Sequence, residues 1–215
     1  MYKVILFDLD GTLTESKEGI INSILYALQK LGIDENDLNR LQPFIGPPLL
    51  DSFMSAYGFT RAKAEIAVQY YREFFSVKGI YENRLYPGIY QLLGDLKNAG
   101  KINVLATSKP LIYATEVLSY FCIPGFFDYI TGSELNGSHT DKKELIKEVM
   151  DHYHDYKPDE FIMIGDRKYD IEGAKENGIT SVGVLYGYGT REELEKAHPD
   201  YLIDNPEELK NIILP

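Results

Sequence analysis

In the stretch "KVILFDLDGTLTES" (residues 3–16), an apolar strand runs directly into two carboxylates. Residues 3–7 carry the β-branched and aromatic side chains that are typical of a buried strand. Asp8 and Asp10 follow at its tip, and side chains two positions apart on a strand point to the same side. Like charges held this close repel each other unless a cation or a shared proton compensates. The pair therefore indicates a functional site at the end of the first strand.

Beyond residue 86, short apolar runs alternate with amphipathic stretches. Strands are predicted at 101–108, 127–134, 160–166, 179–187 and, more weakly, 200–205. Helices are predicted at 88–100, 110–121, 141–153, 168–178 and 206–214. This alternation predicts an α/β protein with a Rossmann-like, doubly wound parallel sheet covered by helices on both faces. In such sheets, functional sites form beyond the carboxyl ends of the strands.

Residues 15–86 interrupt this alternation and predict a separate helical domain. Helices are expected at 17–33 and 61–75, with a kinked loop, "FIGPPLL" (44–50), between them and no convincing strand. We interpret the insert as a small helical cap over the site, which leaves 1–14 and 87–215 as the catalytic core. The alternative is a helical bundle that decorates one edge of the sheet without a role in function.

Composition narrows the classes of partner. The net charge of −11 over 215 residues disfavours nucleic acid and anionic membranes, because both would be repelled. No apolar run approaches the roughly 18 residues that a membrane span needs. Cys122 is the only cysteine, so no disulfide framework is expected, and we interpret it as a small apolar core residue. His152 and His154 are interpreted as solvated surface residues. We predict a cytoplasmic protein that is a monomer or a homodimer.

Polar residues gather at the predicted carboxyl ends of several strands. They are, in chain order, Asp8, Asp10, Thr107, Ser108, Lys109, Lys142, Asp166 and Asp170. Three convergent carboxylates, those of Asp8, Asp10 and Asp166, would repel one another, and a hard divalent cation resolves that repulsion. Ligands that are all oxygen favour Mg²⁺. A metal held by few carboxylates typically also carries a substrate phosphate, for which the hydroxyls and a lysine are natural ligands.

Four segments resemble the signature motifs of the haloacid dehalogenase superfamily and occur in the same order. They are "DLDGT" (8–12), "VLATS" (104–108), a lysine before a helix, and "IGDRKYDIEGA" (164–174). The helical insert resembles the small cap type of this superfamily. Residues 132–146 and 165–179 are similar to bacterial phosphatases of the phosphoglycolate phosphatase-like group.

The resemblance implies a role for each residue at the strand ends. Asp8 would be the nucleophile that becomes an aspartyl phosphate, and Asp10 the acid and base. The metal would be held by Asp8, the main-chain carbonyl of Asp10, and Asp166, while Asp170 would orient water or the lysine. The phosphate would be bound by Thr107, Ser108 and Lys142.

Two lysines compete for the place of the family lysine. Many relatives have that lysine followed by proline, and here this pair is Lys109-Pro110. We favour Lys142, because it follows the third predicted strand at the start of a helix.

The leading prediction is a Mg²⁺-dependent phosphatase that hydrolyses a small phosphomonoester metabolite through an aspartyl phosphate, with phosphoglycolate as the first candidate substrate. The alternatives are a 5'-nucleotidase acting on nucleoside monophosphates, a phosphomutase, and a non-catalytic regulatory binding module. The presence of both Asp8 and Asp10 argues against the last of these. The candidate specificity elements are the loop 44–50 and the aromatic residues Tyr70, Tyr71, Phe74 and Tyr81. The alternative for the aromatic residues is that they form the core of the cap.

Overall fold

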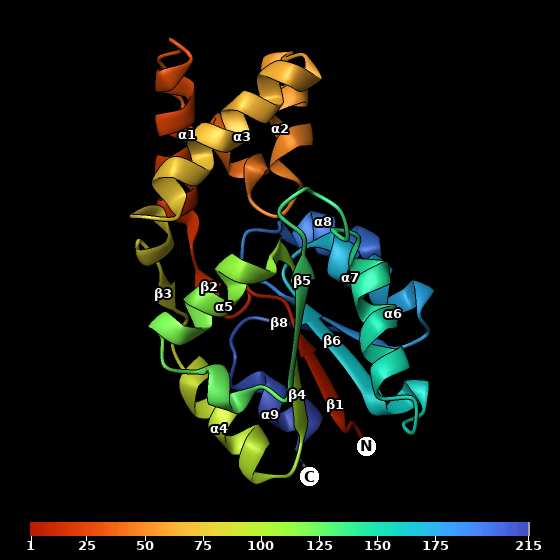
Figure 1. Cartoon of the computed structure of the whole chain (residues 1–215). Helices are drawn as coiled ribbons and strands as arrows, with labels where there is room; N and C mark the ends of the chain where they lie inside the picture. The colour runs from red at the N-terminus through yellow and green to blue at the C-terminus, as the bar shows by residue number, and fades with distance from the viewer. Residues whose placement is uncertain (215) are drawn as a thin grey trace. The chain divides into compact units, whose positions relative to one another are not determined.

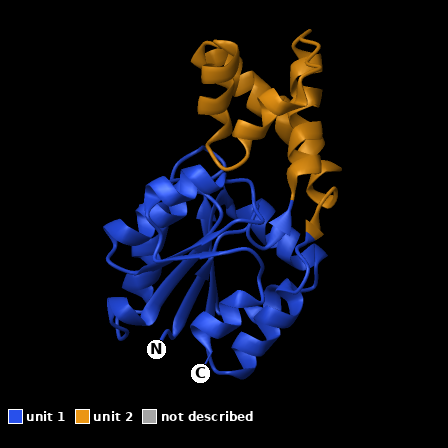
Figure 2. Cartoon of the chain, turned by 180° about the vertical axis from the view of Figure 1, so that it is seen from behind, with its two compact units in different colours: residues 1–15, 85–215 blue, residues 16–84 orange. Residues whose placement is uncertain are grey.

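The computed structural model describes residues 1–214, and the chain divides into two compact units (Figure 2). Unit 1 comprises Met1–Glu15 and Leu85–Pro215, and unit 2 comprises Ser16–Arg84. The chain leaves unit 1 after Glu15 and returns to it at Leu85. Each unit has its own core and is described by itself.

Unit 1 is built on a six-stranded sheet with the order β5-β4-β1-β6-β7-β8 (Figure 1). All neighbouring pairs are parallel, which confirms the predicted α/β class with a Rossmann-like core. β1 lies in the interior of the sheet, and all four of its residues are buried, as its apolar composition requires. The strands are β1 (Val4–Phe7), β4 (Ile102–Pro110), β5 (Tyr129–Ser133), β6 (Phe161–Gly165), β7 (Thr180–Val184) and β8 (Tyr201–Ile203).

Helices cover both faces of this sheet. Figure 1 shows α6 and α7 over one face and α4, α5 and α9 over the other. Alternate residues of β1, Val4 and Leu6, pack with Ile146 and Val149 of α6, and a fully buried aliphatic side chain contributes about 1.5–3 kcal/mol. The helices are α4 (Ile89–Asn98), α5 (Leu111–Tyr120), α6 (Lys142–His152), α7 (Lys168–Glu176), α8 (Arg191–Ala197) and α9 (Glu208–Ile213), with 3₁₀ turns η3 (Pro124–Phe126) and η4 (Pro158–Glu160).

The strand order places the carboxyl end of β1 at a switch point. From β1 the chain continues first to β4 and β5 on one side, and later to β6, β7 and β8 on the other. The connections on the two sides therefore diverge at the end of β1, which is where ligand sites form in open sheets of this kind. Asp8 is the first residue beyond that end.

Unit 2 is helical, but it differs from the prediction in two respects. Its elements are α1 (Lys17–Lys30), η1 (Leu38–Phe44), α2 (Leu49–Tyr57), α3 (Arg61–Phe75) and η2 (Gly79–Tyr81). The sequence analysis missed α2, because Pro47 and Pro48 mark a loop while the helix begins directly after them. It also found no strand between 15 and 86. A short sheet of β2 (Thr14–Glu15) and β3 (Arg84–Leu85) forms where the chain crosses between the units.

Two further interpretations need correction or refinement. Cys122 is exposed rather than part of the core, because the chain reverses after α5 and passes through this residue with a φ of 56°. Phe44 of the loop 44–50 is buried, with its ring edge-on to Phe53 at 5.1 Å within unit 2. Among the candidate aromatics, Tyr71 is buried and stacks on Phe75, which favours the core interpretation for this residue, whereas Tyr81 is 43% exposed.

Candidate active site

The two acids of the opening motif lie in a tight loop, not on the strand. β1 ends at Phe7, although the main-chain N–H of Asp8 still donates to the Ile164 carbonyl (2.9 Å). The chain then turns, and the N–H groups of Leu13 and Thr14 both donate to the Leu9 carbonyl. The pleat therefore does not set the directions of the Asp8 and Asp10 side chains, because the strand ends at Phe7 before them.

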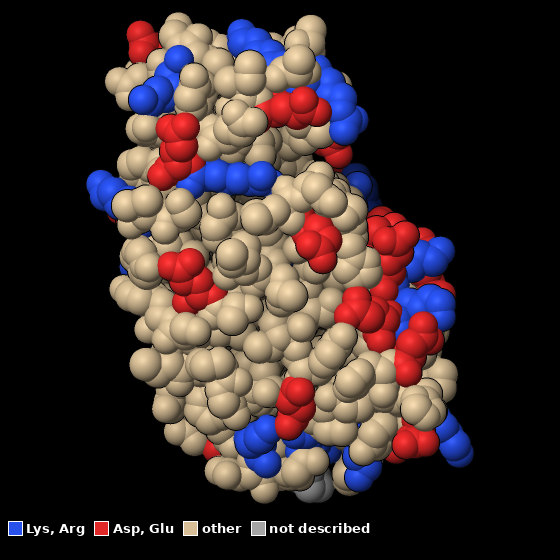
Figure 3. Space-filling model, viewed as in Figure 1, with Lys and Arg blue, Asp and Glu red and all other residues tan. Residues whose placement is uncertain are grey.

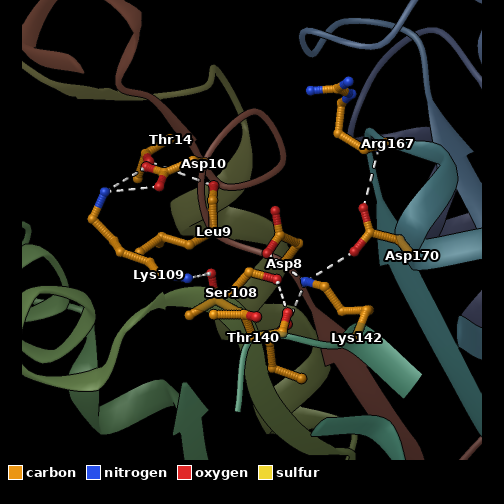
Figure 4. Close-up of polar contacts among 12 residues, drawn as sticks. Asp8, Leu9, Asp10, Thr14, Ser108, Lys109, Thr140, Lys142, Arg167 and Asp170 are labelled. Atoms are coloured by element: carbon orange, nitrogen blue, oxygen red, sulfur yellow. Dashed lines mark hydrogen bonds and ion pairs between the residues drawn. The ribbon is translucent and has the colours of Figure 1, made fainter. Parts of the chain in front are cut away.

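Each acid is paired with its own lysine (Figure 4). Nζ of Lys142 lies 2.7 Å from Oδ1 of Asp8, and Nζ of Lys109 lies 2.7 Å from Oδ2 of Asp10. The two lysines that compete in the sequence thus both reach the loop and serve different carboxylates. Lys142, which the sequence analysis favoured, is the lysine that contacts Asp8.

The start of α6 places Lys142 in the interior. The side chain of Asp141 caps the helix by accepting from the N–H of Lys143, and Lys142 is the first helical residue. Its ammonium group donates to Oδ1 of Asp8 (2.7 Å) and to the Ala106 carbonyl (2.9 Å), and it forms an ion pair with Oδ1 of Asp170 (2.9 Å). Burial opposes its charge, but the carboxylates of Asp170 and Asp8 outweigh this effect and raise the pKa of Lys142. It therefore remains a cation.

Asp166 has the most unusual environment in the site. It is fully buried, and its Oδ2 accepts from the N–H of Tyr188 (2.7 Å), while its Oδ1 has no hydrogen-bond partner among residues 1–214. Burial, and then the charges of Asp8 and Asp170, raise the pKa of Asp166 well above its usual range. A buried carboxylate oxygen without a partner is costly, so the site fits a ligand that supplies positive charge.

A divalent metal matches this donor set. Asp8, Asp166 and Asp170 each offer an oxygen atom, and these atoms lie within 4.8 Å of one another. Hard cations such as Mg²⁺ prefer oxygen ligands of this kind. Asp170 is already engaged, because it accepts from the N–H of Arg167 (3.1 Å) and contacts Lys142. Burial raises its pKa to about 6, against the opposing effect of Lys142.

The hydroxyl groups of Thr107 and Ser108, at the end of β4, differ in whether their protons are already donated in a hydrogen bond. Ser108 donates its hydroxyl proton to the Thr140 carbonyl (2.8 Å). Oγ1 of Thr107 accepts from the N–H of Lys109 (3.2 Å), so its own proton is available for another acceptor. The hydroxyl of Thr107 can therefore donate to a bound ligand, whereas that of Ser108 connects β4 to the loop that precedes Lys142.

Comparison with known proteins identifies the family. The family model for haloacid dehalogenase-like hydrolases matches residues 5–184. The chain is a haloacid dehalogenase-like hydrolase. This confirms the predicted superfamily.

Relatives of this hydrolase include a 5'-nucleotidase and a phosphoglycolate phosphatase. It is 46% identical to a 5'-nucleotidase of Pseudomonas aeruginosa, over 99% of this chain and 96% of the relative. It is 28% identical to a phosphoglycolate phosphatase of Vibrio parahaemolyticus, over 98% of this chain and 96% of the relative. The crystal structure of a predicted phosphatase from Clostridium acetobutylicum is 45% identical and superposes with a TM-score of 0.94, over 100% of this chain and 99% of the other. These relatives support the predicted class, a phosphoric monoester hydrolase.

The hydrolase has one site element that the sequence analysis did not assign to the site, the glycine-rich segment "GYGT" (187–190). A Cβ on Gly187 would overlap the side chain of Asp166, and a Cβ on Gly11 (φ 90°) would overlap the carboxylate of the same residue. The two glycines thus let main chain close around Asp166, and this closure brings the N–H of Tyr188 to it. In the sequence, the spacing of the glycines indicates close approach of the main chain, but it does not reveal which carboxylate the segment contacts.

We expect Asp166→Asn to raise the Tm of the metal-free hydrolase near pH 8 and to abolish stabilisation by Mg²⁺. The raised pKa means that the folded state binds this proton more tightly than the unfolded state. The native protein therefore loses stability as the pH rises from about 4 through the raised pKa, and an asparagine escapes that loss. The test is Tm against pH, with chelator and with excess Mg²⁺.

The exposed Asp159 provides a matched control, since Asp159→Asn should leave both the pH dependence and the Mg²⁺ effect unchanged. Stabilisation of Asp166→Asn by Mg²⁺ equal to that of the native protein would show that Asp166 does not hold the metal.

Within residues 1–214, none of the helices combines the length and the apolar composition that a bilayer crossing requires.

Proposed function

We propose that this hydrolase is a Mg²⁺-dependent phosphatase that transfers the phosphoryl group of a small phosphomonoester to Asp8 and then to water. The observation that carries the proposal is the 2.7 Å contact between Asp8 and the buried cation of Lys142. A carboxylate attacks a phosphate only where positive charge offsets the repulsion between the two anions. Lys142 supplies that charge from within the fold.

In the first step, a carboxylate oxygen of Asp8 forms a bond to phosphorus as the bond from phosphorus to the leaving oxygen breaks. Asp10 gives its proton to that leaving oxygen, and the alcohol departs. In the second step, Asp10 takes a proton from water as the water oxygen attacks phosphorus. The bond between phosphorus and Asp8 breaks, inorganic phosphate leaves, and Asp10 is again protonated.

Other residues position these groups. Lys109 holds Asp10 through two contacts of its Nζ, at 2.7 and 3.1 Å. The free hydroxyl proton of Thr107 would bind a phosphoryl oxygen. Asp8, Asp166 and the main-chain carbonyl of Asp10 would hold Mg²⁺, which would supply charge to neutralise the phosphoryl oxygens. Asp170 keeps Lys142 in place through its 2.9 Å contact.

Nucleoside 5'-monophosphates now rank ahead of phosphoglycolate as substrates. The sequence alone favoured phosphoglycolate. The 5'-nucleotidase relative is 46% identical, whereas the phosphoglycolate phosphatase relative is 28% identical, and both comparisons cover nearly the whole chain. Phosphoglycolate remains the second candidate.

Unit 2 is proposed as the cap that excludes water and selects the substrate. Its support is the insertion point, since the chain enters unit 2 at Ser16, six residues beyond Asp10, and leaves it at Arg84. Cytoplasmic location and a monomeric or homodimeric state stay predictions.

The proposal is tested by steady-state kinetics on adenosine 5'-monophosphate, phosphoglycolate and p-nitrophenyl phosphate. We expect turnover of all three esters, with the largest kcat/KM for the nucleotide, loss of activity in chelator, and recovery with Mg²⁺. Full turnover in excess chelator would contradict the metal assignment. A larger kcat/KM for phosphoglycolate than for the nucleotide would make phosphoglycolate the first candidate substrate.

A further inference from the structure

Unit 1 has a pocket at the ends of the neighbouring strands β4 and β5, and its lining does not include the ion-paired residues of the candidate active site. Its volume is about 300 Å³, and it is lined by Leu111, Ile112, Ser133, Glu134 and Leu135. The first two residues open α5, directly after β4, and Ser133 ends β5. Ligand pockets have volumes of roughly 300–1,000 Å³, so this pocket is at the small end of that range and has room for a group the size of one ring system.

The pocket adjoins the candidate active site through the backbone. Pro110 of β4 is the register partner of Ser133, and Thr107 is the partner of Gly132. The segment that carries Thr107 and Lys109 therefore runs beside the segment that forms one wall of the pocket. Lys109 in turn holds Asp10. A substrate with its phosphate near Asp8 would extend its leaving group past Asp10, and the pocket begins two residues beyond Lys109.

The walls combine apolar surface with a single carboxylate. Leu111, Ile112 and Leu135 are 39%, 58% and 40% exposed, which is high for large apolar side chains. Figure 3 shows that the surface over α5 is mostly uncharged in the view of Figure 1. Apolar walls of this kind suit a flat ring, because a ring buries area on both of its faces.

The carboxylate belongs to Glu134, and it has no hydrogen-bond or ion-pair partner within the described part of the chain, residues 1–214. Its main chain is nevertheless fixed by a turn. The N–H of Glu134 donates to the Ser138 carbonyl, and the N–H of Gly137 donates to the Glu134 carbonyl, both at 3.0 Å. An unpaired carboxylate accepts hydrogen bonds from N–H donors and repels anions.

We propose that this pocket binds the nucleobase of a nucleoside 5'-monophosphate, with the ring against the apolar walls and an N–H donor of the base on Glu134. The inference rests on the proposed function and deepens it, since it names the groups that would select the leaving group. The same carboxylate disfavours phosphoglycolate, which brings a second negative charge.

Two variants of Glu134 separate the hydrogen bond from the charge. The probes are adenosine 5'-monophosphate, purine riboside 5'-monophosphate, which lacks only the amino group, phosphoglycolate, and acetyl phosphate, which has no ring. Glu134→Ala should reduce the preference for the amino-bearing nucleotide about fivefold in kcat/KM. Glu134→Gln keeps an acceptor oxygen and should preserve part of that preference. Both variants should raise kcat/KM for phosphoglycolate about fivefold, because both remove the charge. Acetyl phosphate should be unaffected.

The matched control is Glu172→Ala, at an exposed position of α7. It should leave all four values unchanged. If the native protein hydrolyses the nucleotides but Glu134→Ala preserves every ratio, the pocket is not a base subsite, while the proposed function stands. If the native protein hydrolyses none of the four probes, the proposed function is wrong and this inference fails with it.

Discussion

We expect Asp8→Asn to abolish turnover of every phosphate ester, with a loss in kcat of at least about 10⁴-fold. An amide is a poor nucleophile, and the change also removes a negative ligand from the proposed metal site. The contact between Lys142 and Oδ1 of Asp8 is polar and buried, so the variant should be checked for native structure by circular dichroism. Mass spectrometry after mixing with substrate should find no phosphate on the protein.

Asp10→Asn provides the contrast, because Asp10 is proposed to act on protons rather than on phosphorus. A p-nitrophenolate leaves without a proton, whereas an alkoxide does not. The variant should therefore release p-nitrophenol in a burst approaching one equivalent per enzyme and then turn over slowly, with phosphate detectable on Asp8. An alkyl phosphate should give no burst. Identical behaviour of the Asp8 and Asp10 variants towards both esters, without a phosphoenzyme in either, would refute this division of roles.

The second large effect is expected for Lys142→Ala, with a loss of transition-state stabilisation of about 2–4 kcal/mol, or roughly 30- to 900-fold in kcat/KM. The cation lies 2.7 Å from Asp8 and 2.9 Å from Asp170, and its removal leaves both carboxylates without that charge. The stability of the folded protein should fall as well, because removal of one partner of a buried ion pair leaves the charge of the other partner buried and uncompensated.

The double variant Lys142→Ala/Asp170→Asn separates activity from stability. Removing the Asp170 charge should recover much of the lost Tm, while kcat/KM stays low because Asp8 still lacks its cation. Lys109→Ala should cost less than Lys142→Ala, and its effect should be larger for esters with poor leaving groups, since Lys109 contacts Asp10. A larger loss of kcat/KM for Lys109→Ala than for Lys142→Ala would show that Lys109, and not Lys142, is the phosphate-pairing lysine.

The parts of the fold that could be predicted depend on local patterns. The parallel sheet could be predicted from short apolar runs between amphipathic helices, since a strand that is buried on both faces has a continuous apolar run within a single segment. The helix α2 was not predicted. Its apolar pattern, with Leu49 and Phe53 four residues apart, begins directly after two prolines, and such a pair usually marks a loop. Cys122 was misplaced because its apolar neighbours suggest burial, whereas its left-handed backbone turns it outward.

By itself, the sequence determined the fold class and the set of chemical groups at the strand ends. Parallel strands bring their carboxyl ends to one edge, so Asp8, Asp10 and Asp166 could be expected there together. Only the tertiary structure decided the pairing. Lys142 reaches Asp8 across 134 positions and Lys109 reaches Asp10 across 99, while Tyr188 donates to Asp166 across 22. Periodicity fixes which residues share an edge, but the helix start, the side-chain direction and the close packing of Gly187 fix which atoms meet. Those depend on contacts between segments that no local pattern contains.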